Sequence, residues 1–254
     1  MGERNRNSSI SAATRRIQWR AAALALSFLA IAGAYLGSRY RAAERLVRAD
    51  PTQILKDPAL LQRAVNRGRP LYQKHCATCH GAALQGNLAR GTPNLAKDAW
   101  LYGSDPVAVE HTILYGIRSG HPKAHNVTDM PALVRSGQIS ADEARDVVEL
   151  IESLAGELHD SQMAERGRAV YYGKGNCFDC HAADALGVTD YGAPALTGPI
   201  WLYGGDRQTL YQSVLNGRHG ICPAWIDKLT PLQIRSLTLY LVSTSRAAPA
   251  ITRN

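Results

Sequence analysis

The sequence contains few residues of several types and lacks the pattern of β-strands, and these features limit the possible fold classes. Its 254 residues include two phenylalanines, three methionines and five cysteines. No segment alternates apolar and polar residues over a length typical of a half-buried strand. The sequence therefore predicts an all-α fold.

Net charge is nearly absent outside the amino-terminal region. The formal charge of the chain is +8, but residues 1–50 hold nine arginines against three acidic residues. The other 204 residues carry 20 basic and 18 acidic side chains. Because the basicity is confined to one end of the chain, it favours a lipid surface and argues against binding to nucleic acid.

Four of the five cysteines lie in two C-x-x-C-H motifs, "CATCH" (76–80) and "CFDCH" (177–181). This pattern attaches a c-type haem: both thiols add to the haem vinyl groups, and the histidine faces the iron. Tetrahedral zinc held by the two C-x-x-C pairs is the alternative, but both pairs also carry the histidine. We therefore expect two covalently bound haem c groups, whose bulk also accounts for the low phenylalanine content. The predicted attachment sites are Cys76, Cys79, Cys177 and Cys180, and the predicted proximal ligands are His80 and His181.

The surroundings of the two motifs form an internal repeat. The segment "TPNLAKDAWLYG" (92–103) returns as "APALTGPIWLYG" (193–204), and Cys76 and Cys177 share the same offset of 101 residues. The segment "RGRPLY" before the first motif likewise returns as "RGRAVY" before the second. The chain thus carries two tandem haem domains, which we place at residues 63–157 and 158–254.

Each repeat is expected to close with an amphipathic helix. In the first repeat this helix follows Ser140, which forms a capping box with Glu143, and it stops at Gly156. In the second repeat Thr230 is the predicted cap, and Pro231 lies in the first turn.

The ligand on the far side of each iron is less evident. In the first repeat Met130 is the candidate, presented from a loop by Pro131, with His121 and His125 as alternatives. In the second repeat "CPAW" stands where the first has "MPAL", so Cys222 is the candidate, with His219 or an open iron as alternatives. A methionine ligand raises the reduction potential, whereas a thiolate stabilises ferric iron, so two such haems would differ widely in potential.

Residues 21–37, "AAALALSFLAIAGAYLG", contain no charge and follow Arg15, Arg16 and Arg20. Their length favours a retained membrane anchor over a cleaved signal peptide, which usually has a shorter apolar region. We expect a cytoplasmic tail at 1–18, a transmembrane helix at 19–40 and a tether at 41–62. Because bacterial c-type haems are attached in the periplasm, the chain is predicted to be a single-pass protein of the bacterial inner membrane with periplasmic haem domains.

With the repeat, "WLYG", "NGRHGICPAW" and the closing segment "LTPLQIRSLTLYLVS" in view, residues 64–245 resemble the membrane-anchored di-haem subunit III of cbb3-type cytochrome c oxidases. The resemblance implies two class I cytochrome c domains with His and Met ligands. It also implies electron transfer from a donor cytochrome or quinol-oxidising complex towards the oxidase core subunits. Cys222 stands where the family has methionine.

Two functions follow from these observations. The first is a membrane-anchored electron carrier without catalysis of its own, whose partners are the membrane and redox proteins. The second is a redox enzyme, similar to thiosulfate dehydrogenases, in which the Cys222-ligated haem acts on sulfur compounds. The paired W-L-Y-G segments favour the first.

Overall fold

The computed structural model describes residues 3–97, 100–126 and 129–247, and the side chains of residues 18–245 within these ranges. The chain divides into two compact units, Met1–Arg48 and Ala49–Asn254.

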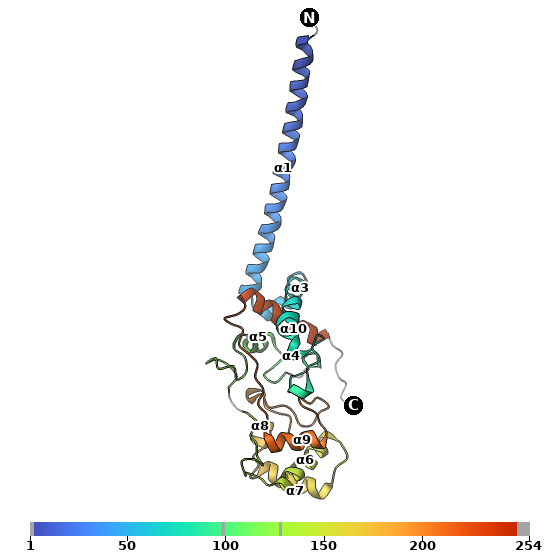
Figure 1. Cartoon of the computed structure of the whole chain (residues 1–254), viewed down its shortest axis with the longest axis vertical. Helices are drawn as coiled ribbons and strands as arrows, with labels where there is room; N and C mark the ends of the chain where they lie inside the picture. The colour runs from blue at the N-terminus through green and yellow to red at the C-terminus, as the bar shows by residue number, and fades with distance from the viewer. Residues whose placement is uncertain (1–2, 98–99, 127–128, 248–254) are drawn as a thin grey trace. The chain divides into compact units, whose positions relative to one another are not determined.

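The first unit is one helix, α1 (Glu3–Arg48), drawn in blue in Figure 1. Its stretch Gln18–Arg48 has a mean hydropathy of 1.7 over an 18-residue window and is long and apolar enough to cross a membrane. Large apolar side chains along it are exposed, among them Trp19 (75%) and Phe28 (72%). Such a helix exceeds the roughly 20 residues that a bilayer requires.

The expected tether at 41–62 is largely helical. Helix α1 continues to Arg48, α2 spans Pro51–Ile54 and α3 begins at Pro58. The Asp-Pro pairs start these helices: Asp50 and Asp57 each accept a hydrogen bond from a first-turn amide, and each proline occupies a position that needs no amide hydrogen.

The second unit consists of short helices joined by loops, and among the described residues β-structure is limited to isolated bridges. The helices after α3 (Pro58–His75) follow in this order: α4 (Ala77–His80), η1 (Leu88–Arg90), η2 (Leu95–Lys97), α5 (Pro106–Tyr115), α6 (Ala141–Ala155), α7 (Ser161–Tyr172), α8 (Phe178–His181), η3 (Thr189–Tyr191), α9 (Arg207–Asn216) and α10 (Pro231–Ala247).

The two predicted closing helices are confirmed as α6 and α10. The Ser140 hydroxyl accepts from the Glu143 amide, the Glu143 carboxylate accepts from the Ser140 amide, and Gly156 ends α6 in the left-handed conformation. Thr230 precedes α10 and exchanges equivalent hydrogen bonds with Gln233.

The closing helices are exchanged between the repeats. Helix α10 packs on α3 and α5 of the first repeat, and α6 packs on α7 and α9 of the second. In Figure 1 the red α10 accordingly lies among the blue-green helices. One core joins Tyr72 and Val109 to Leu237 and Leu241, whereas another joins Val147 to residues of the second repeat. Each closing helix therefore packs on the other repeat and not on its own.

A glycine in each "RGR" segment permits these helix crossings. A Cβ on Gly68 of α3 would overlap the Ser236 carbonyl of α10 and lie 2.6 Å from the Tyr240 Cβ. A Cβ on Gly167 of α7 would overlap the Asp146 carbonyl of α6 in the same way. The backbones of the exchanged helices thus meet at glycine.

We expect Gly68→Ala to lower the free energy of unfolding by about 1–3 kcal/mol, because α3 and α10 must separate to admit the methyl group. Urea denaturation followed by circular dichroism would measure the loss. Gly198→Ala is the control, since a Cβ there meets nothing within 4 Å, and its effect should stay within about 0.5 kcal/mol. Equal effects for the two variants would contradict the close crossing.

Candidate haem sites

The two C-x-x-C-H motifs fold into matching single-turn helices, α4 and α8. The His80 amide donates to the Cys76 carbonyl at 2.9 Å, and the His181 amide donates to the Cys177 carbonyl at the same distance. The turn brings both thiols and the ring to one end of a longer helix, α3 or α7. This is the local geometry that attachment to a haem requires.

Both histidine rings are held in one orientation by a proline carbonyl. His80 Nδ1 lies 3.4 Å from the Pro93 oxygen, and His181 Nδ1 lies 2.9 Å from the Pro194 oxygen. A carbonyl only accepts, so Nδ1 carries the proton and Nε2 keeps its lone pair for a metal. Burial lowers the pKa of both histidines, which keeps the rings neutral as ligation requires.

Met130 and Cys222 each lie on a short bridge to the other repeat. Cys222 exchanges two backbone hydrogen bonds with Ile117, both 2.9 Å long. Met130 does the same with Arg218, at 3.2 and 3.0 Å. Ile117 and Arg218 are themselves equivalent positions of the repeat, so the two bridges form a symmetric pair.

These bridges place each sulfur with the haem motif of the opposite repeat. Cys222 contributes, after burial, to raising the pKa of the Cys76 thiol to about 12. Met130 packs against the core that also holds Cys177 and Trp201. These positions differ from the sequence-based pairing of His80 with Met130 and of His181 with Cys222, because the segments that follow α5 and α9 cross over along with the closing helices.

The alternative histidine ligands are engaged elsewhere. His219 has 55% of its side chain exposed and pairs with Asp129 at 2.6 Å. His121 stacks on Tyr115, and its Nδ1 accepts from the Lys123 amide. His125 stacks on Tyr102 with the ring centroids 3.9 Å apart. The geometry therefore favours the two sulfur atoms.

Sequence reasoning missed several positioning residues. The carbonyls of Pro93 and Pro194 have no side-chain signature, and only their equal spacing of 13 residues from each histidine could have indicated them. The tyrosine of each W-L-Y-G segment also contacts a glycine of the other repeat. Tyr102 covers Gly192 and Tyr203 covers Gly91, and both glycines are left-handed, with φ near +63° and +62°.

The donor set fits a haem c at each motif. Two thiols on one turn, a neutral imidazole with a fixed tautomer and an opposing soft sulfur are the groups that hold such an iron. Zinc shared between the two C-x-x-C pairs would require them in one cluster, whereas they belong to separate cores, and the described residues contain no group of three or more metal-binding side chains.

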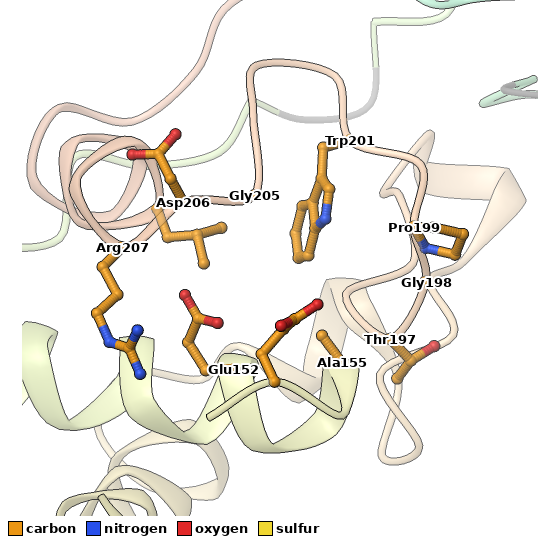
Figure 2. Close-up of a pocket in the computed structure, with 11 residues that line it drawn as sticks. Glu152, Ala155, Thr197, Gly198, Pro199, Trp201, Gly205, Asp206 and Arg207 are labelled. Carbon is orange, nitrogen blue, oxygen red and sulfur yellow. The ribbon is translucent and has the colours of Figure 1, made fainter. Parts of the chain in front are cut away.

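A cavity of about 560 Å³ opens between the end of α6 and the start of α9 (Figure 2). Trp201 lines it, but none of the attachment cysteines or candidate ligands does. Glu152 also lines it, and this side chain is only 4% exposed. Burial raises the pKa of Glu152, with Arg207 acting in the opposite direction.

We expect Glu152→Gln to stabilise the protein at pH 7 by up to about 1 kcal/mol. The pKa of Glu152 is higher in the folded chain than in the unfolded chain, so stability is lost as the pH rises from the unfolded to the folded pKa. The gain should therefore shrink towards zero at a pH below both values. Urea denaturation at pH 7 and pH 4 measures it, with the exposed Glu165→Gln as control; a gain independent of pH would contradict this account.

Comparison with known proteins gives matches over both repeats. The family model described as cytochrome c matches residues 65–155, and the model for cytochrome c oxidase, cbb3-type, subunit III matches residues 162–241. The cbb3-type cytochrome c oxidase subunit CcoP of Cereibacter sphaeroides is 37% identical over 198 residues, which cover 78% of this chain and 67% of the relative. Subunit FixP of a Bradyrhizobium species is 38% identical, with the same coverage. Subunit CcoP of an Azospirillum species is 40% identical over 74% of this chain and 65% of the relative.

Proposed function

Because the chain belongs to the family of cbb3-type cytochrome c oxidase subunit III, we propose that it is the membrane-anchored di-haem cytochrome that delivers electrons to such an oxidase. When bound, each haem c carries one electron by cycling between ferric and ferrous iron. The observation that carries the proposal is the pair of attachment motifs within one compact unit, interlocked by exchanged helices. Sulfur-compound oxidation is not favoured, since the similarity to oxidase subunits covers both repeats.

In this proposal the haem of the first repeat is attached through Cys76 and Cys79, with His80 and Cys222 as its axial ligands. The haem of the second repeat is attached through Cys177 and Cys180, with His181 and Met130. The two bridges support this assignment, because each fixes a ligand loop of one repeat to the turn after α5 or α9 of the other.

The chain also has a proposed topology. Residues 1–18 are cytoplasmic, 19–40 span the inner membrane, and 41–62 lead into the two haem-binding repeats, 63–157 and 158–254, on the periplasmic side. The exposed apolar side chains of α1 support the anchor. The partners are the oxidase core subunits, which take electrons, and a periplasmic or membrane-bound donor.

Oxygen consumption tests this function. An oxidase complex assembled with the wild-type chain should consume oxygen with a reduced c-type cytochrome as donor. A complex with His80→Ala and His181→Ala should lose most of that rate but retain activity with a small-molecule reductant that reaches the core directly. Reduction of an acceptor by thiosulfate in the absence of core subunits would instead support the enzyme.

A further inference from the structure

The surface around the attachment turn differs between the two repeats. In the second repeat Tyr172, Phe178 and Leu186 are exposed to 43%, 37% and 52%. The Phe178 ring lies 5.9 Å from that of Tyr172, whose hydroxyl donates to the Ala183 carbonyl. We call these three side chains, with the aspartates beside them, the second-repeat patch.

Aspartates lie close in the sequence to two of these apolar side chains, Phe178 and Leu186. Asp179 and Asp184 are exposed, and Asp184 accepts from the Leu186 amide at 3.1 Å. With Asp190, residues 172–191 hold three acidic side chains against one basic one, Lys174, which pairs with Glu143 at 2.6 Å. The patch therefore combines exposed apolar side chains with an excess of negative charge.

The first repeat shows that the fold does not require this surface. Residues 73–90 hold two basic side chains and no acidic one. The backbone nevertheless follows the same course, since Gln73 donates to the Ala82 carbonyl as Tyr172 donates to that of Ala183. The residues equivalent to Tyr172, Phe178, Asp179, Asp184 and Leu186 are Gln73, Ala77, Thr78, Ala83 and Gln85.

We propose that the second-repeat patch is the docking surface for the electron donor, a redox protein with an apolar contact area ringed by lysines. This inference rests on the proposed function and adds the site at which electrons enter the protein. Phe178 and Asp179 lie between the two attachment cysteines, so a protein docked on them lies beside the second haem. The donor loses one electron, the ferric iron held by His181 gains it, and no proton or bond is exchanged.

The negative charge of the patch suits a transient partner. Complementary charges accelerate encounter by tenfold or more at low ionic strength, and weak redox complexes bury little area. A permanent contact with the oxidase core would be larger and more apolar than three side chains among aspartates.

The test uses the full-length di-haem protein in detergent and, as probe, a basic soluble c-type cytochrome with lysines around its haem edge. Two variants alter the patch. Asp179→Asn with Asp184→Asn removes charge, and a graft of the five first-repeat residues removes the whole surface. Glu157→Gln with Asp227→Asn is the control, because it changes the net charge equally at exposed sites elsewhere.

Stopped-flow reduction measures the second-order rate constant at low and high salt, and calorimetry measures binding with both proteins ferric. We expect the charge variant to react at least about fivefold more slowly than the control at low salt, with the difference lost at high salt. The graft should lose binding altogether.

Rates and affinities equal to those of the control would overturn the proposal. So would variants that keep donor binding but release the oxidase core subunits, since the patch would then be a subunit interface. Binding between the two ferric proteins does not depend on electron delivery to the oxidase. Loss of this binding therefore tests the patch alone. A protein that binds the donor but passes no electrons onward would contradict the proposed function instead.

Discussion

Replacing Met130 by alanine should remove the sulfur ligand from the second haem, the one attached through Cys177 and Cys180. Met130 packs in the core that contains Cys177, and its loop is fixed to Arg218 by two backbone hydrogen bonds. Loss of a methionine ligand lowers the reduction potential, by on the order of a tenth of a volt or more. A redox titration followed by absorbance should show one of the two transitions shifted downward and the other unchanged.

Met163→Leu is the matched control, because Met163 lies at the start of α7 and belongs to neither bridge. Its titration should superimpose on that of the wild type. A Met130 variant with both transitions unchanged would show that this methionine is only a core residue.

Replacing Cys222 by methionine should raise the potential of the first haem by on the order of a tenth of a volt or more, since a thiolate stabilises ferric iron and a thioether does not. Burial raises the pKa of the Cys222 thiol to about 11, so the free side chain is a neutral thiol at pH 7. Ferric iron would supply the charge that makes the thiolate stable there.

Electron paramagnetic resonance of the oxidised protein checks this expectation. The wild type should show a low-spin signal of the thiolate type, and Cys222→Met should replace it with one of the histidine–methionine type. Cys222→Ser should also lose the thiolate signal, without gaining a methionine one. An identical spectrum from all three proteins would mean that Cys222 does not touch the iron.

Local features of the fold were predictable because their causes lie within a few residues. The C-x-x-C-H turns depend on one helical turn each, and the capping box needs only Ser140 and Glu143. The anchor follows from an uncharged run of sufficient length. The predicted fold class was confirmed for the same reason, because its prediction needed only the recognition of helical segments and of the internal repeat.

The exchange of helices could not be predicted in this way. Helices α6 and α10 both present an apolar face, and α3 and α7 both present a glycine to receive it. The same apolar faces and glycine positions are therefore compatible with packing within a repeat and with packing between repeats. Domain swapping between identical elements presents the same choice. The path of the loops after α5 and α9, including the bridge of Ile117 to Cys222, decides between these two packing arrangements.

We expect each iron to take its histidine from one repeat and its sulfur from the other, and a pair of single-haem chains tests this arrangement most directly. One chain carries Cys177→Ala and Cys180→Ala, so only the first haem is attached; the other carries Cys76→Ala and Cys79→Ala. The exchanged arrangement predicts the thiolate resonance signal in the first chain and its absence from the second. A thiolate signal found only in the second chain would mean that each repeat supplies both ligands of its own haem, and would contradict the account.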